Sequence, residues 1–138
     1  MTAIYLESSA ILKWLLGEPD AERVLSKINR TEAVVTSVLT LVEVERALIR
    51  AETWKMLTSG QAERLRGLFA RAKASWILME ISAEVRARAM RGFPAEPVRT
   101  LDAIHLSTAL IFLRVFPDLE MLSFDQRIRD NGSILGIA

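Results

Sequence analysis

The chain has 138 residues, of which 51% are hydrophobic and 25% are charged. This composition is typical of one globular domain and excludes a disordered chain. The absence of cysteine excludes a disulfide framework and a thiolate metal site, and the formal net charge of +1 excludes a general polycation. Arginine supplies most of the 18 basic residues, however, and its planar guanidinium suits phosphate, so nucleic acid stays open as a partner.

The sequence gives no sign of a membrane span or of a targeting segment. It contains no run of 18 apolar residues, and its start lacks a basic segment leading into a long apolar stretch. We therefore expect one soluble domain over residues 1–138, located in the cytoplasm and without a membrane partner.

The first sixteen residues predict a strand that runs directly into a helix. Residues 4–6 form a short apolar run, Glu7 ends it, and residues 10–16 resume an apolar pattern with helical spacing. Ser8 and Ser9 are of the type that accepts free N–H groups at the start of a helix. Glu7 is therefore expected at the carboxyl end of a strand, the edge at which open parallel sheets bind ligands.

The next segment repeats this alternation. A helix is predicted over residues 21–28, after the Pro and acids of residues 18–20, and a β-like run over residues 33–36 follows. Ser37 can cap a long helix from about Val38 to Arg50 or beyond.

The middle of the chain continues with a helix, a strand and a helix. Thr58 or Ser59 is expected to start an Arg-rich amphipathic helix whose charges form a solvated face. Residues 76–81 predict the third strand, and Ser82 can cap a helix over residues 83–91.

The last third begins with a loop at residues 92–97, because Gly and Pro interrupt the pattern there. Thr100 is expected to cap a helix over residues 101–114, and residues 120–124 predict a fourth strand that ends at Asp125. Residues 131–132 predict a turn and residues 134–137 a possible short last strand.

Strands that alternate with helices predict right-handed crossovers and a mainly parallel sheet with helices on both faces. The expected fold class is therefore α/β, with a central, mainly parallel sheet of four to five strands.

Most of the carboxylates lie among polar neighbours, where a surface role is the default, but a few are placed differently. Glu7 and Asp125 end predicted strands. Asp102 lies on the helix side that packs on the sheet, where an acid is costly unless a positive group meets it. Periodicity does not choose between Glu43 and Glu45 on the second long helix, although the small neighbours of Glu43 leave room for a ligand.

Four segments together resemble the PIN-domain ribonucleases, and most closely the VapC-type toxins of bacterial and archaeal toxin–antitoxin pairs. The segments are Tyr5-Leu6-Glu7-Ser8-Ser9-Ala10 with Lys13, Thr36-Ser37 followed by Val42-Glu43-Val44-Glu45-Arg46-Ala47-Leu48, Leu101-Asp102-Ala103-Ile104-His105-Leu106, and Ser123-Phe124-Asp125-Gln126-Arg127. The resemblance spans essentially the whole chain and keeps the order and rough spacing of all four motifs, so the expected fold is a PIN-like α/β/α sandwich.

The resemblance implies that Glu7, Glu43, Asp102 and Asp125 are the acids of a metal site, and it selects Glu43 over Glu45. It further implies an endoribonuclease that depends on Mg²⁺ or Mn²⁺, a homodimer, a cognate VapB-type antitoxin, and an RNA substrate such as tRNA or rRNA. Glu7 departs from the family, which usually has Asp there, and this departure puts catalytic activity in question.

Carboxylate chemistry agrees with this interpretation. Clustered carboxylates raise one another's pKa unless a divalent ion neutralises them, and oxygen ligands suit Mg²⁺ or Mn²⁺. We expect Asp102 and Glu7 to be direct ligands. Glu43 and Asp125 would act through water or orient the attacking water.

Two other functions are compatible with an acid-edged α/β fold. A member that has lost turnover through Glu7 would act as a module that binds RNA or antitoxin. A receiver-like phosphoacceptor would need an acid beside Glu7, an Asp ending the third strand and a Lys after the fifth, and the sequence has none of these.

Several further residues have ordinary structural interpretations. His105, the only histidine, is expected to form structural hydrogen bonds rather than to act as a base, and Ser8 and Ser9 to cap a helix or bind the metal shell. The cations Lys13, Arg46, Arg99 and Arg127 are surface charges unless they meet RNA phosphate. Trp14, Trp54 and Trp76 are expected in the core or in a dimer contact. Apolar residues such as Leu12, Trp14 and Leu16 either form the dimer surface or belong to the core.

Overall fold

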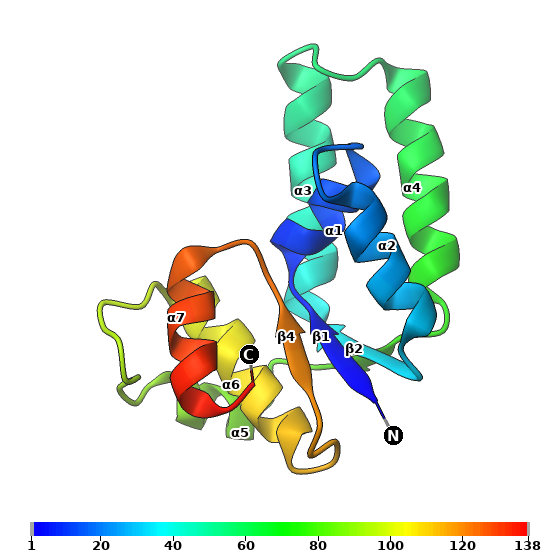
Figure 1. Cartoon of the computed structure of the whole chain (residues 1–138). Coiled ribbons are helices and arrows are strands. Elements are labelled where there is room, and N and C mark those ends of the chain that lie inside the picture. The colour runs from blue at the N-terminus through cyan, green and yellow to red at the C-terminus, as the bar shows by residue number, and fades with distance from the viewer. Residues whose placement is uncertain (1, 138) are drawn as a thin grey trace.

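The computed structural model describes residues 2–137, which form a parallel sheet between two layers of helices (Figure 1). The strands are β1 (Ala3–Leu6), β2 (Ala33–Ser37), β3 (Ile77–Met79) and β4 (Glu120–Leu122). The helices are α1 (Ser8–Leu15), α2 (Ala21–Arg30), α3 (Val38–Thr53), α4 (Ser59–Lys73), α5 (Ala83–Ala89), α6 (Thr100–Leu113) and α7 (Gln126–Leu135).

The sheet has the strand order β3-β2-β1-β4, and every pair is parallel. Ile4 pairs with Val34 of β2 on one side and with Glu120 of β4 on the other. The predicted α/β fold with a central parallel sheet is thereby confirmed, with four strands among the described residues. Because all four strands run the same way, their carboxyl ends share one edge of the sheet.

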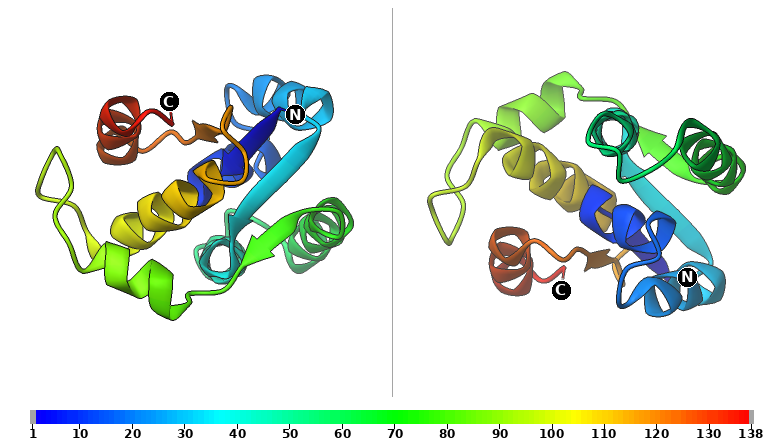
Figure 2. Two further views of the ribbon diagram at one scale, coloured as in Figure 1. Left: turned by 90° about the horizontal axis from the view of Figure 1, so that it is seen from below. Right: turned by 90° about the horizontal axis from the view of Figure 1, so that it is seen from above.

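Each face of the sheet has its own hydrophobic core. Helices α1 to α4 cover one face, on which Leu6, Ile11 and Phe69 are fully buried, and α5 to α7 cover the other, on which Tyr5 and Leu106 are fully buried (Figure 2). The alternation of side chains along β1 explains this division, since successive residues of a strand point to opposite faces.

Helices α3 and α4 form a hairpin that extends beyond the carboxyl edge of the sheet (Figure 1). Ser37 accepts a hydrogen bond from the Leu39 amide, and Thr58 forms a reciprocal capping box with Gln61, so both predicted caps are confirmed. Arg66 of α4 lies within 3.3 Å of Glu45 and 2.9 Å of Glu52, which ties the two helices together.

The prediction for the end of the chain is wrong. Residues 126–135 form the single helix α7, without a turn at residues 131–132, and no strand forms at residues 134–137. The side chain of Asn131 is buried and bonded to the 92–97 loop, so it no longer favours a turn. Gly136, with φ +81°, ends the helix instead.

Two predicted helix caps are also wrong. Ser8 and Ser9 lie inside α1, and the cap is Glu7, whose carboxylate accepts from the Ser9 amide. Thr100 is the first residue of α6, and Arg99 stands at the cap position without a side-chain cap hydrogen bond. Both corrections concern residues of the candidate site.

None of the helices within residues 2–137 combines the length and the hydropathy that crossing a membrane requires.

Candidate active site

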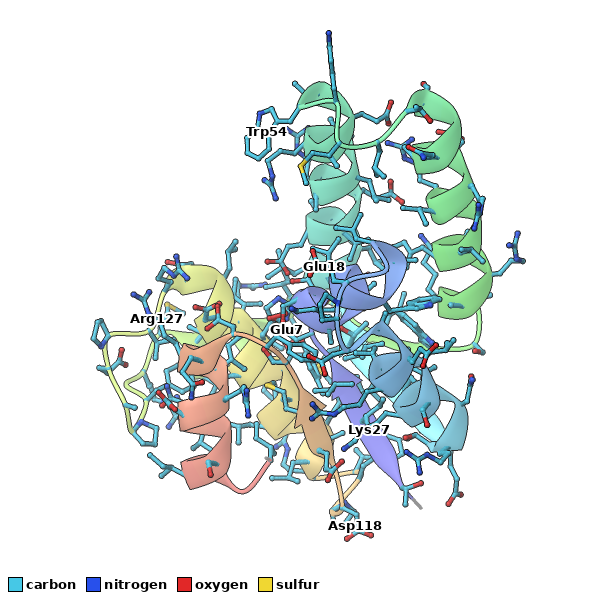
Figure 3. The ribbon with its side chains drawn as sticks, turned by 45° about the horizontal axis from the view of Figure 1, so that its top comes forward. Glu7, Glu18, Lys27, Trp54, Asp118 and Arg127 are labelled. Atoms are coloured by element: carbon cyan, nitrogen blue, oxygen red, sulfur yellow. The ribbon has the colours of Figure 1, made fainter. Side chains whose placement is uncertain are left out.

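The four predicted acids come from four distant segments and line one pocket at the carboxyl edge of the sheet. The pocket has a volume of about 410 Å³. Its lining residues are Glu7, Ser8, Ser9, Leu12, Glu43, Arg99, Thr100, Leu101, Asp102, His105 and Asp125. Figure 3 shows Glu7 near the middle of the molecule, where α1, α6 and β4 approach one another.

Glu7 lies between the end of β1 and the start of α1 and is only 4% exposed. Its Oε2 accepts hydrogen bonds from the Ser9 amide at 2.5 Å and from Ser8 Oγ at 3.2 Å, and its Oε1 accepts from Ser123 Oγ at 3.2 Å. Burial nevertheless raises the pKa of Glu7, and the charge of Glu43 acts in the same direction.

Asp102 lies in the first turn of α6, with its side chain 13% exposed. Its Oδ2 is buried and has no hydrogen-bond partner within residues 2–137. Burial raises the pKa of Asp102, and the charge of Asp125 raises it further. A buried carboxylate oxygen without a hydrogen bond is costly, and the Arg99 Nε stays 3.6 Å away, so this atom is open to a cation that approaches more closely.

Glu43 projects from α3 and is held from the core side by a histidine. Its Oε1 lies 2.5 Å from His105 Nε2, and His105 Nδ1 lies 2.7 Å from the Tyr5 hydroxyl. His105 is 1% exposed, and both of its ring nitrogens have the kind of hydrogen-bond partner that was predicted. Glu45, the alternative that periodicity left open, instead pairs with Arg66 away from the pocket.

Asp125 follows β4 and caps α7. Its Oδ1 accepts hydrogen bonds from the amides of Arg127 at 2.9 Å and Ile128 at 3.4 Å. Its Oδ2 lies 3.8 Å from Arg99 Nη2. One oxygen of Asp125 is thus used by the fold, and the other faces the pocket.

Within residues 2–137, no three acidic or histidine side chains converge closely enough to enclose one cation. Three of the four carboxylates are held by their own surroundings, as caps or by His105. The donor chemistry still fits Mg²⁺ or Mn²⁺, since Mg²⁺ often binds through one or two carboxylates and keeps several waters. The buried Oδ2 of Asp102, which lacks a hydrogen bond, is the observation that supports this fit.

Two residues of the site were missed from the sequence. Tyr5 contacts His105, which holds Glu43, and Ser123 contacts Glu7 directly. Tyr5 could have been found from the alternation of β1, which directs it to the face covered by α6. Ser123 stands in the motif of residues 123–127, but nothing local indicated its contact with Glu7, which spans 116 positions.

The tryptophans and the residues proposed for a dimer surface differ in how far they are buried. Trp76 is buried and Trp14 is partly buried against the core, whereas Trp54 is 66% exposed at the tip of the α3–α4 hairpin (Figure 3). Leu12 and Leu16 also pack against the core rather than forming an exposed patch.

A larger cavity of about 620 Å³ lies beside β4 and α7. It is lined by basic and acidic side chains together, and Lys27 and Glu120 neutralise each other there at 3.0 Å. It therefore lacks the gathering of four carboxylates, with one buried oxygen that has no hydrogen bond, that distinguishes the smaller pocket.

Comparison with known proteins shows the family to which the chain belongs. The PIN domain model matches residues 4–132. Ribonuclease VapC46 of Mycobacterium tuberculosis is 38% identical over 139 residues, which cover 100% of this chain and 96% of the relative. Ribonuclease VapC35 of the same species is 34% identical over 137 residues, which cover 98% of this chain and 93% of the relative.

Two solved structures share the fold. Mycobacterium tuberculosis VapC20, described as a toxin that cleaves the sarcin-ricin loop, superposes with a TM-score of 0.65 at 17% identity, covering 98% of this chain and 96% of its own. VapBC2 from Rickettsia felis, bound to a DNA fragment from its promoter, gives a TM-score of 0.58 at 13% identity, covering 89% and 99%. The chain belongs to the PIN-domain family, and its relatives within that family are VapC proteins.

Proposed function

We propose that this protein is a metal-dependent endoribonuclease that acts as the toxin of a type II toxin–antitoxin system. The observation that carries the proposal is the meeting of Glu7, Glu43, Asp102 and Asp125 in one pocket, where Asp102 Oδ2 is buried without a hydrogen bond. The relatives named as ribonucleases, similar over nearly their whole length, support the same activity.

In this proposal Asp102 and Glu7 would hold a Mg²⁺ or Mn²⁺ ion. The ion, when bound, would supply a Lewis acid that offsets phosphate charge and lowers the pKa of a nearby water. Glu43 would orient the attacking water, since His105 fixes its carboxylate from the core side. Asp125 would contact the ion or its waters through Oδ2, because the cap of α7 occupies Oδ1.

We infer three kinds of partner from the same relationship. The first is a VapB-type antitoxin, supported by the VapBC2 structure. The second is an RNA substrate, with structured RNA such as tRNA or rRNA as the first candidate, because VapC20 is described as cleaving the sarcin-ricin loop. The third is a second copy of the chain, in a homodimer. We also infer that the protein acts in the cytoplasm.

Incubation of the purified protein with total RNA, with Mn²⁺ or with EDTA, tests the activity directly. We expect cleavage with Mn²⁺ only, and a loss of at least about a hundredfold in rate for Asp102→Asn. Asp118→Asn is the matched control, since Asp118 lies outside the pocket, at the lower end of the molecule and away from Glu7 (Figure 3). Full activity of Asp102→Asn would refute the assignment.

A second matched pair tests the choice between neighbouring acids of α3. Glu43→Gln removes a pocket carboxylate, whereas Glu45→Gln removes one that pairs with Arg66. We expect a large loss of cleavage for Glu43→Gln and none for Glu45→Gln.

The variant Glu7→Asp tests the alternative function. If the natural chain does not cleave RNA and Glu7→Asp does, the natural chain is the inactive binding module considered from its sequence.

A further inference from the structure

Arg99 occupies a position that local helix physics does not favour. It is the cap residue of α6, where Ser, Thr, Asp or Asn would accept a hydrogen bond, and it makes no side-chain cap bond. Its positive charge also stands beside the positive end of the helix dipole. A residue that breaks a local rule without a local benefit is expected to serve the site.

The charged group of Arg99 lies between two carboxylates of the pocket. Its Nε is 3.6 Å from Asp102 Oδ2, and its Nη2 is 3.8 Å from Asp125 Oδ2. Both distances exceed those of a charge-assisted hydrogen bond, so the guanidinium attracts the carboxylates without being locked to them. This explains how Asp102 Oδ2 has a cation nearby and still lacks a hydrogen bond.

Arg99 is also free to move. Its side chain is 68% exposed, so turning away from the carboxylates costs little burial. Among the described residues, the other cations predicted to meet phosphate have no such position: Lys13 pairs with Glu18 at 3.6 Å, and the guanidinium groups of Arg46 and Arg127 form no ion pair with a site carboxylate.

We infer that Arg99 is a displaceable counter-ion of this site: it bridges Asp102 and Asp125 in the metal-free protein, is displaced when a divalent cation binds, and then contacts the RNA phosphate. The inference rests on the proposed function. A divalent cation beside Asp102 would repel the guanidinium, and the mouth of the pocket, where Arg99 stands, is where the phosphate backbone of a substrate must arrive.

The inference predicts opposite effects of one substitution. In Arg99→Gln, Mn²⁺ no longer competes with the guanidinium for the carboxylates, so the Kd for Mn²⁺ falls about three- to tenfold. The KM for RNA, measured at saturating Mn²⁺, rises about three- to tenfold, and the salt dependence of RNA binding loses about 0.7 in log–log slope, as expected for one phosphate contact.

Titration calorimetry with Mn²⁺ and no RNA measures the first effect without relying on activity. Arg64→Gln is the matched control, because it removes the same charge from an exposed position of α4 outside the pocket. We expect the Mn²⁺ affinity of Arg64→Gln to equal that of the natural protein. Arg99→Lys keeps the charge and should fall between the natural protein and Arg99→Gln.

Unchanged or weaker Mn²⁺ binding by Arg99→Gln, with measurable binding by the natural protein, would overturn the counter-ion role and leave the nuclease proposal intact. An unchanged KM would overturn the phosphate contact. Absence of Mn²⁺ binding in both proteins would refute the metal dependence itself, and this inference with it.

Discussion

His105 joins the buried core to the candidate site. It is almost fully buried, and its two ring nitrogens contact the Tyr5 hydroxyl and the Glu43 carboxylate. Burial raises the pKa of Tyr5, so its hydroxyl stays protonated and can donate to Nδ1, which leaves Nε2–H to donate to Glu43. The core thus fixes the position of an acid that lies on a different element.

Replacing His105 tests this connection through stability. His105→Leu replaces the imidazole by an apolar side chain of similar size and leaves the Tyr5 hydroxyl and one Glu43 oxygen without their partner, so we expect a loss of about 2–4 kcal/mol in the free energy of unfolding. Urea denaturation measures it. Tyr5→Phe, which removes one hydroxyl, should cost about 1 kcal/mol. An equal cost for both would show that the contact with Glu43 adds nothing.

Glu7 shows what the usual Asp of the family would lose. The longer side chain caps α1 with one oxygen and reaches Ser123, after β4, with the other. An Asp could keep the cap, which needs only a short side chain. The carboxylate of Glu7 thus contacts both the start of α1 and the segment that follows β4.

At the level of elements, α7 holds the loop that leads to Arg99 and α6. The buried side chain of Asn131 accepts from the Ala95 amide at 2.9 Å and donates to the Ala95 carbonyl at 3.0 Å. Its Nδ2 also donates to the Arg127 carbonyl at 3.0 Å. The side chain of Asn131 thus gives the loop backbone the hydrogen-bond partners that a sheet or helix would otherwise supply.

Asn131→Ala removes these bonds and should release the loop. We expect a loss of about 1–2 kcal/mol in stability, because the partly buried backbone groups of Ala95 lose their partner. We also expect faster tryptic cleavage at the exposed Arg91, measured by mass spectrometry under native conditions. Asn29→Ala, at an exposed position of α2, is the control. Unchanged cleavage at Arg91 would show that other contacts hold the loop.

The sequence could predict most elements but not all of their ends. Alternating apolar runs and capping residues such as Ser37 are local signals, and they identified the four strands and the helices before α7. The Asn131-Gly132 pair is an equally clear local signal for a turn, but a contact with Ala95, 36 positions away, overrides it. Caps at Glu7 and Arg99 broke the usual residue preferences and so were also missed.

The residues of the candidate site could likewise be predicted only in part. The positions of Glu7 and Asp125 follow from strand ends, and that of Asp102 from the packed side of its helix. The choice of Glu43 over Glu45 required a family resemblance, since what separates them is whether His105 or Arg66 stands opposite. Periodicity along one helix carries no information about what the next helix presents.

Considered as a whole molecule, the chain is nearly neutral, yet it gathers four carboxylates at one edge of its sheet. Burial raises the pKa of both Glu7 and Asp102, so the folded protein binds these protons more tightly than the unfolded chain. Their contribution to stability is therefore most favourable below the ordinary carboxyl pKa of about 4, and it is lost as pH rises through the raised values.

This linkage predicts how pH and metal act together. Without metal, the melting temperature should fall, relative to Asp102→Asn, as pH rises from about 4 toward neutrality, since the ionised acids are then buried together. Mn²⁺ at about 100 times its Kd should restore about 2.7 kcal/mol at neutral pH, and less at pH 5, where protons compete for the same oxygens. Differential scanning calorimetry over this range, with EDTA or with Mn²⁺, measures both effects. A Mn²⁺ stabilisation that did not depend on pH, or that survived in Asp102→Asn, would place the ion away from these carboxylates.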